Sequence, residues 1–348
     1  MLIPHDRLRS LTTAIFSTAG CEPDEAARVA HYLVQSNLVG HDSHGVIRIP
    51  TYVDFLKTGK VIAGRKLKVI LENEAIAVVD GEFGLGQSVG EQATRLGIDK
   101  SRQHGVSVIA LRNSGHLGRI GDFPLMAARE GLLSLHWVNT SGAGILVAPF
   151  GGLERRLSAC PIAAGVPIEN GPHMVLDMSG CMIAEGKVRV ARNQGVPVPD
   201  GCLIDALGQP TNDPNVFYGD PPGAILPIAG HKGSGLTMIA EMLGGALTGS
   251  QCSNPKNADR VVNGMLSIYM DRKFFLSSED FSSEVNRFIA WVKTSKTTTP
   301  EGEILMPGEI EERTQTNRLA NGIDIDETTL QQIEEKCEML GITMNEYV

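Results

Sequence analysis

Between about residues 69 and 281 the chain is organised as short apolar runs bounded by glycine, separated by longer segments with helical periodicity. The runs read AIAVVD, VSVIAL, LLSLHWV, MVLD and AILPIA, and their length and composition are typical of strands. Helices are predicted between them, around residues 88–104 and 234–247. In the second helix the apolar side chains share one face: Leu236, Ile239, Ala240, Leu243 and Leu247. This part of the chain therefore predicts an α/β fold.

Both ends of the chain are predicted to be helical. Over residues 24–39 the apolar side chains form one stripe, which comprises Ala26, Val29, Ala30, Leu33 and Val34. Pro23 suits the first turn of this helix, and Gly40 is a natural end. The last helical stretch also aligns its apolar residues, namely Leu330, Ile333 and Cys337. We expect a helical domain made of residues 1–70 and 282–348, and an α/β domain made of residues 71–281.

Composition limits the classes of partner. A net charge of −9 argues against a nucleic-acid-binding protein, which would present a basic face. The chain has no apolar run of 18 residues, and its first ten residues lack a signal-peptide pattern, so no membrane association is expected. Six scattered cysteines form no C-x-x-C pair and no zinc-ligand spacing. The sequence therefore predicts a cytoplasmic protein with reduced thiols and no metal site.

One motif suggests a dinucleotide-binding loop, but its context does not fit. Residues 84–90 read GLGQSVG after a predicted strand and before a predicted helix. A Rossmann fold also needs an acidic residue about 20 positions on, at the end of the next strand. That strand instead runs into Arg112 and Asn113, without a carboxylate. We therefore interpret the loop as a glycine-rich turn that packs a helix closely on a sheet.

The densest group of reactive side chains lies in residues 40–52, GHDSHGVIRIPTY. Reduction of a carbonyl needs a proton donor with a pKa near neutrality, which imidazole supplies with little tuning. A 2-oxo acid also carries a carboxylate, which a guanidinium can hold with two parallel hydrogen bonds. His44 and Arg48 together meet both needs. Pro50 argues against a continuous helix through this segment. Taken alone, the segment fits a catalytic site and a purely structural polar helix cap with a solvated arginine equally well.

Two further clusters follow predicted strands. His116 lies in NSGHLG directly after VSVIAL, where α/β proteins often place ligands, although such a histidine can also be purely structural. The segment GHKGSG leads into the helix at 234–247, and its exposed amides with one lysine form a possible phosphate cradle. The cradle residues are His231, Lys232 and Gly233. A flexible turn is the alternative, since the Walker spacing is absent.

Taken together, these segments resemble the malate/lactate dehydrogenase family, which includes ureidoglycolate dehydrogenase, diketogulonate reductase, sulfolactate dehydrogenase and piperideine-2-carboxylate reductase. The matching stretches run from about residue 40 to about residue 315. They are GHDSHGVIRIPTYVDFLKTG, NSGHLGRIGDFP, VAPFGG, VLDMSGCMIAEGKVRVA, GVPVPDGCLIDALGQPTNDP, GHKGSGLTMIAEMLGGALTG and LMPGEIEER. The sequences of two of these stretches, GVPVPDGCLID and HKGSGLTMIAEMLGGAL, most resemble those of bacterial hydroxycarboxylate dehydrogenases.

The resemblance implies a fold and an activity. It implies a non-Rossmann cofactor domain with a largely antiparallel sheet, a helical domain formed by the two terminal segments, and a homodimer with active sites near the subunit interface. The implied reaction is hydride transfer between a nicotinamide cofactor and a small 2-hydroxy or 2-oxo acid. NAD is favoured over NADP because no arginine pair stands out beside the cofactor segments.

The resemblance also assigns roles to individual residues. The catalytic set is His44 with Ser43, together with His116 and Lys187, and the proton-donor role is shared between the two histidines with a preference for His44. Substrate binding is assigned to Arg48, Ser141 and Glu185. Cofactor binding is assigned to Thr140, Asp177, Met178, Ser179, His231, Lys232, Gly233, Gly308 and Glu309.

Two departures from the family pattern affect the expected chemistry. The usual D-M-A-T-S reads DMSGC over residues 177–181, which removes hydroxyl groups near the cofactor. In the cyclic-imine reductases an aspartate accompanies the serine–histidine pair, whereas this chain has Lys187 there. A lysine cannot be the acidic member of such a relay, so reduction of a cyclic imino acid is the less favoured alternative. Lys187 could instead donate a hydrogen bond to a substrate carboxylate or hydroxyl.

Overall fold

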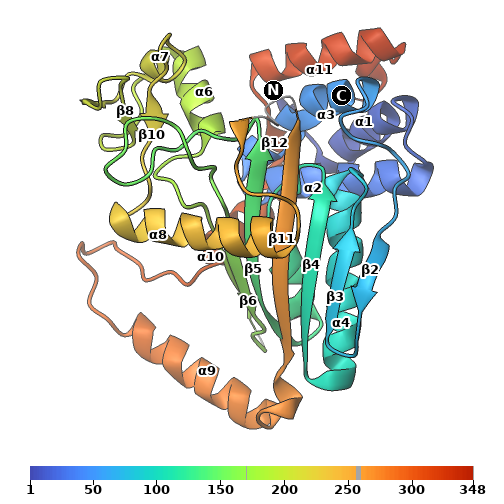
Figure 1. Cartoon of the computed structure of the whole chain (residues 1–348), viewed down its shortest axis with the longest axis vertical. Helices are drawn as coiled ribbons and strands as arrows, with labels where there is room; N and C mark the ends of the chain where they lie inside the picture. Colours follow the sequence, from blue (N-terminus) through green and yellow to red (C-terminus); the bar gives the residue numbers. More distant parts are fainter. Residues whose placement is uncertain (170, 256–259, 348) are drawn as a thin grey trace.

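The computed structural model describes residues 1–169, 171–255 and 260–347, and in this part of the chain the largest sheet has seven strands in the order β2-β3-β4-β11-β5-β6-β7 (Figure 1). Neighbouring strands are antiparallel except β3 and β4, which are parallel. The expected largely antiparallel, non-Rossmann sheet is therefore confirmed. Its strands are β2 (Lys68–Glu72), β3 (Ile76–Asp80), β4 (Val106–Ser114), β5 (Leu132–Gly142), β6 (Ile162–Val166), β7 (Met174–Met178) and β11 (Val261–Asp271).

Helices cover both faces of this sheet. Val138 of β5 points into an apolar core that it shares with Ala93 and Phe123 of two helices. The next residue, Asn139, points to the opposite face because side chains alternate along a strand, and there it bonds to the carboxylate of Glu241. The covering elements are α4 (Gly86–His104) and α5 (Asp122–Arg129) on the first face, and α8 (His231–Ala240) with the π-helical turn η3 (Glu241–Leu247) on the second.

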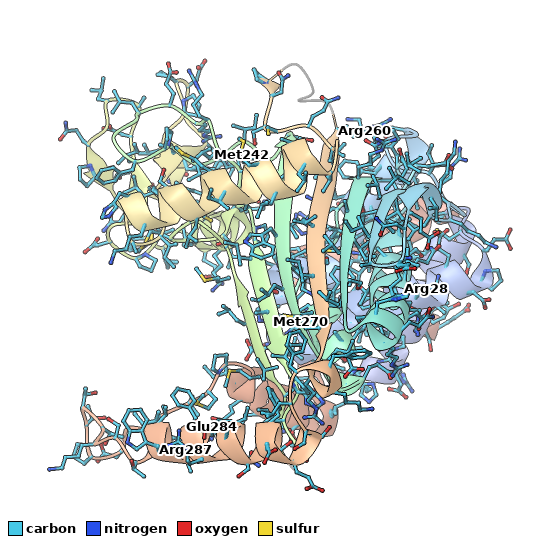
Figure 2. The ribbon with its side chains drawn as sticks, turned by 60° about the horizontal axis from the view of Figure 1, so that its bottom comes forward. Arg28, Met242, Arg260, Met270, Glu284 and Arg287 are labelled. Atoms are coloured by element: carbon cyan, nitrogen blue, oxygen red, sulfur yellow. The ribbon has the colours of Figure 1, made fainter. Side chains whose placement is uncertain are left out.

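The apolar face predicted for residues 234–247 is not the face that packs on the sheet. Small residues make this contact, and a Cβ on Gly244 would lie only 2.7 Å from the backbone nitrogen of Asn139. Only Ala240 of the predicted set is fully buried, because bulky side chains would hold the helix away from the strands. The exposed apolar residues on this element are Leu236, Met238, Ile239, Met242 and Leu247. Figure 2 shows the element, with Met242 labelled, lying across the strands.

The helical ends of the chain pack together, as predicted. The stripe of residues 24–39 is buried throughout, Pro23 begins its helix, and Gly40 follows with a φ of +85°. Ile333 and Cys337 of the last long helix join the same core as Leu33. The elements are α1 (His5–Thr18), α2 (Pro23–Leu38), α3 (Ile49–Lys57), α10 (Glu309–Asn321), α11 (Glu327–Leu340), η6 (Met344–Glu346) and the paired strands β1 (Leu2–Ile3) and β12 (Ile323–Asp324).

A third apolar cluster lies between residues 147 and 225 and was not anticipated from the sequence. Val147, Val188, Leu203 and Phe217 are among its buried members. Its elements are α6 (Glu185–Gln194), α7 (Pro214–Phe217) and the short strands β8 (Leu203–Ile204), β9 (Pro210–Thr211) and β10 (Ala224–Ile225). Figure 1 shows this group beside the sheet, on the side opposite α4.

The predicted domain limits at residues 70 and 282 stay a prediction, but two elements near them have clear positions. Strand β2 belongs to the sheet and not to the helical cluster. Helix α9 (Ser278–Lys293) follows η5 (Arg272–Phe274) and projects away from the helical cluster (Figures 1 and 2). None of the described helices is long and apolar enough to cross a membrane.

Candidate active site

The segment that carries His44 is held by side chains from both ends of the chain. It forms two 3-10 turns, η1 (Asp42–His44) and η2 (Val46–Arg48), and Pro50 lies in the first turn of α3. The amide group of Asn37 donates to Asp42 Oδ1 at 2.7 Å and accepts from the Val46 backbone at 2.8 Å. Arg318 of α10 pairs with Asp42 at 2.6 Å. Asn37 of α2 and Arg318 of α10 therefore hold the loop together from both ends of the chain.

Ser43, Tyr52 and Gln87 form a hydrogen-bonded group around the two stacked histidines. Ser43 Oγ lies 3.1 Å from His44 Nδ1, and Tyr52 Oη lies 2.6 Å from His116 Nδ1. The two imidazole rings stack with centroids 5.8 Å apart and an interplanar angle of 12°. Gln87 Nε2 donates to Tyr52 Oη at 3.2 Å, so the phenol hydrogen can be donated to His116 Nδ1. In that arrangement the neutral His116 ring carries its hydrogen on Nε2.

Burial and positive neighbours keep both histidines neutral. The pKa of His44 is well below 6.5, because the ring is desolvated and because Arg48 and His116 lie near it. The pKa of His116 falls to about 3, through desolvation and the charge of Arg48. The sequence predicts an imidazole that needs little tuning to have a pKa near neutrality, whereas in the structure the pKa of both rings is strongly lowered. A neutral imidazole can accept a proton from a hydroxyl group, which is the base required in the oxidation direction.

Arg48 is oriented by the same loop. Its Nε donates to the backbone oxygen of Ser43 at 2.7 Å, which directs the end of the guanidinium into the cavity. Desolvation lowers the pKa of Arg48, but Tyr52 and Glu185 act in the opposite direction. A partly buried cation beside two neutral rings is a suitable partner for the carboxylate of a small acid.

These residues face a cavity of about 920 Å³ between the helical cluster, the sheet and the third cluster. Such a volume is in the range of small-molecule and cofactor sites. Many of the predicted site residues line it: Ser43, His44, Arg48, His116, Thr140, Asp177, Ser179, Glu185 and Lys187. Other predicted residues are not in this lining: Ser141, Met178, His231, Lys232, Gly233, Gly308 and Glu309.

Hydrogen bonds hold the polar side chains that line the cavity on the side of the sheet. Thr140 Oγ1 accepts from Asn263 at 2.9 Å, and Asp177 Oδ2 accepts from the Gly121 backbone at 2.7 Å. Ser141, the next residue on β5, is buried and lies 3.5 Å from the Val262 backbone oxygen. Because side chains alternate along the strand, Ser141 points away from the side of Thr140.

Met178 is the last residue of β7, and the other remaining predicted cofactor residues lie at two helix starts. His231 and Lys232 are exposed at the beginning of α8, where the His231 ring contacts Phe150 with centroids 5.8 Å apart. Gly308 precedes α10 with a φ of +101°, and a Cβ there would lie 2.8 Å from the His173 backbone oxygen. Lys293 and the Met306 amide hold the pKa of Glu309 below its ordinary value.

The glycine-rich loop at 84–90 has the packing role expected of it. A Cβ on Gly86 would lie 2.1 Å from the backbone oxygen of His116, so only glycine allows helix α4 to begin there. Gly90 approaches Phe123 in a similar way. The loop thus packs against the backbone of His116, and Gln87 within the loop donates a hydrogen bond to Tyr52 Oη.

Several residues of the site were not predicted from the sequence. Tyr52 stands one helical turn beyond Arg48, a spacing that could have identified it. Arg119 lines the cavity and forms a buried ion pair with Asp122 at 2.6 Å. Arg189 and Tyr218 line the cavity from the third cluster, where nothing in the local sequence indicated them. Within the described residues no cluster of His, Cys, Asp or Glu is arranged to hold a metal ion.

Comparisons with known proteins place the chain among dehydrogenases of one family. The profile of the malate/L-lactate dehydrogenase family matches residues 3–334. Hydroxycarboxylate dehydrogenase B of Escherichia coli O157:H7 is 38% identical over 339 residues, covering 96% of this chain and 93% of that protein. The solved structure of sulfolactate dehydrogenase from Methanocaldococcus jannaschii has a TM-score of 0.88 and 34% identity, and the match covers 100% of this chain and 99% of that one. The structure of Δ1-piperideine-2-carboxylate reductase from Pseudomonas syringae has a TM-score of 0.83 and 29% identity, covering 97% and 99%.

Proposed function

The chain belongs to the malate/L-lactate dehydrogenase family, and from this premise we propose that it transfers a hydride between a nicotinamide cofactor and a small 2-hydroxy or 2-oxo acid. The observation that carries the proposal is the placement of Arg48 beside the paired rings of His44 and His116 in one cavity. Arg48 binds the carboxylate, and an imidazole exchanges a proton with the oxygen on the adjacent carbon.

The cavity has room and polar groups for a cofactor as well as a small acid. Its volume of about 920 Å³ exceeds what a three- or four-carbon acid needs. Thr140, Asp177 and Ser179 form its polar wall and are the residues we assign to the nicotinamide end. When bound, the nicotinamide supplies or accepts the hydride. Met178, Gly308 and Glu309 stay predicted contacts. The exposed Lys232, with His231 and Gly233 at the start of α8, is proposed to hold a phosphate.

The proton role is assigned first to His44, with Ser43 orienting its ring. In the oxidation direction the neutral ring accepts the hydroxyl proton. In the reduction direction a bound carboxylate would offset the charge of Arg48, which is the second-largest cause of the low pKa of His44. His116, fixed by Tyr52, is proposed to donate a hydrogen bond to the substrate oxygen through Nε2. Lys187, in the first turn of α6, is proposed to assist in substrate binding. A role for Ser141 in substrate binding stays a prediction.

We also propose that the enzyme works as a homodimer in the cytoplasm and prefers NAD. The exposed apolar side chains of α8 and η3 support the dimer, because a contiguous apolar surface is usually covered in solution. The projecting α9 adds Phe288 and Trp291, which are also exposed. All six cysteines are free thiols, which supports a reducing compartment.

Reduction of a cyclic imino acid is the second candidate. It is favoured by the similarity to the piperideine-2-carboxylate reductase structure. Lys187 argues against it, because an ammonium group cannot serve as the acidic member of the proton relay.

One experiment separates these candidates. Oxidation of NADH and NADPH is followed by absorbance with a panel of 2-oxo acids, cyclic imino acids and a control without substrate. We expect turnover with one or more 2-oxo acids and a preference for NADH. Turnover of cyclic imines alone would transfer the assignment to the second candidate, and no turnover with any compound would overturn both.

A further inference from the structure

Helix α6 places an acidic side chain next to the cation that we assign to substrate binding. Its first turn packs directly on the histidine loop: a Cβ on Gly186 would lie 3.0 Å from Ser43 Cβ and 4.0 Å from Arg48 Nη2. The neighbouring residue is Glu185, a carboxylate close enough to act electrostatically on Arg48. The same guanidinium must remain available for the carboxylate of the substrate.

The carboxylate of Glu185 is engaged elsewhere. Arg189 donates from two nitrogens to Oε1, at 3.2 and 2.8 Å, and from Nη2 to Oε2 at 2.9 Å. Tyr218 Oη donates to Oε1 at 2.8 Å. No hydrogen bond joins Glu185 to Arg48 in the described part of the chain.

The restraint has a physical origin in the fold. Glu185 and Arg189 are four residues apart on α6, in the orientation that favours an ion pair along a helix. Tyr218, the residue that follows α7, donates to Oε1 of Glu185. The guanidinium of Arg192 stacks on the Tyr218 ring, 4.7 Å from the ring centroid. If these donors were lost, the Glu185 carboxylate could turn to Arg48 and compete with a bound acid, because a guanidinium makes only one bidentate pair with a carboxylate at a time.

We propose that Arg189 and Tyr218 are positioning residues that hold Glu185 away from Arg48 and so keep Arg48 open to the carboxylate of the substrate. The inference rests on the proposed function of Arg48, and it replaces the predicted direct contact of Glu185 with the substrate by an indirect effect on substrate affinity.

The test is a double-mutant cycle with two readouts. The variants are Arg189→Met, Tyr218→Phe, Glu185→Gln and Arg189→Met/Glu185→Gln. The first readout is KM and kcat for the 2-oxo acid that the parent reduces fastest; the second is the Kd for oxalate, measured by calorimetry without turnover. Arg156→Met is the control, since Arg156 is an exposed arginine whose carboxylate partner is Glu154 and not Glu185.

We expect Arg189→Met to raise both KM and the oxalate Kd by about 3- to 10-fold, with kcat within about twofold of the parent, the range of a partly exposed ion pair. Tyr218→Phe should act in the same direction but less. In the Glu185→Gln background Arg189→Met should have no effect, because no competing charge remains.

Two results would overturn the inference. An equal effect of Arg189→Met with and without Glu185 would show that Arg189 itself reads the substrate. A weaker oxalate affinity in Glu185→Gln alone would show that Glu185 contacts the bound acid. A parent that binds oxalate but reduces no 2-oxo acid would refute the proposed function, while the oxalate cycle would still decide the role of Arg189.

Discussion

The imidazole rings of His44 and His116 lie nearly parallel, with centroids 5.8 Å apart, although one ring comes from a turn of the helical cluster and the other follows strand β4 of the sheet. Two stacked rings cannot both be imidazolium cations without strong repulsion, so at most one ring of the pair can be positively charged. A change at either ring therefore affects the titration of the other.

Replacement of His44 by alanine should lower kcat by roughly 10²–10⁴, the usual contribution of a positioned acid or base. The Kd for NADH, measured by fluorescence, should stay unchanged because the residues that we propose for the nicotinamide end, Thr140, Asp177 and Ser179, lie on or next to the sheet. His116→Ala is the matched comparison. If His44→Ala keeps most of its activity and His116→Ala has none, the proton role belongs to His116.

The low pKa of His44 predicts opposite pH dependences for the two reaction directions. Oxidation needs the neutral ring, so kcat/KM should stay constant as the pH falls from about 8 to 6.5 and decline only at more acid pH. Reduction needs the protonated ring, so kcat/KM should rise as the pH falls, by up to about tenfold per pH unit. A loss of oxidation rate with its midpoint at or above pH 6.5 would contradict the depressed pKa.

Arg48→Lys should raise KM and lower kcat/KM by at least about tenfold, near 1.4 kcal/mol. Lysine keeps the charge but makes a point contact, so the carbonyl is no longer oriented. The measurement is the ratio of turnover of a 2-oxo acid to that of its amide, in the parent and in the variant. If this ratio is the same in both proteins, Arg48 does not recognise the carboxylate.

Gly86→Ala should lower the melting temperature by a few degrees, because its Cβ would lie 2.1 Å from the backbone oxygen of His116 and overpacking costs about 1–3 kcal/mol. NADH affinity of the folded protein should change little. Gly235→Ala is the control, since a Cβ there meets nothing within 4 Å. A large rise in the Kd for NADH at an unchanged melting temperature would instead indicate a dinucleotide-binding loop.

Buried His136 should make the protein sensitive to acid. Its ring bonds to Ser134 and Ser267, and burial lowers its pKa to about 3, below the ordinary 6.5. The unfolded chain then binds a proton that the folded chain refuses, so its contribution is full above pH 6.5 and is lost as the pH falls toward 3. At pH 5 the loss is about 2 kcal/mol.

The check on His136 is the free energy of unfolding in urea at about pH 7.5 and pH 5. His136→Asn should show a smaller decrease between these two conditions than the parent. The exposed His104→Asn should behave like the parent. The same pH dependence in His136→Asn as in the parent would show that this ring does not control acid stability.

The sequence predicted correctly those features of the fold that depend only on residues close together in the chain. The apolar stripe of α2, its start at Pro23 and the absence of a continuous helix before Pro50 depend on neighbours within one or two turns, and all three are found. The apolar face of α8 was misleading, because a helix that approaches a sheet closely needs small side chains on the contact and can leave its bulky ones outside.

The site could be predicted only in part. His44 and Arg48 lie close together in the chain, so their joint chemistry could be recognised. Tyr52 and His116 are 64 residues apart and meet only through the packing of the helical cluster on α4. The third cluster contributes Arg189 from α6 and Tyr218 from the end of α7, two separate helices that only tertiary packing brings to the cavity.

The ion pair of Asp42 with Arg318 joins residues 276 positions apart. A ribosome therefore delivers His44 and Arg48 long before the side chain that locks their loop. A nascent chain has the reactive groups but lacks their fixed geometry until α10 has been synthesised and has folded back onto α2. The fixed geometry of this loop thus arises late in biosynthesis, because it depends on contacts with both ends of the chain.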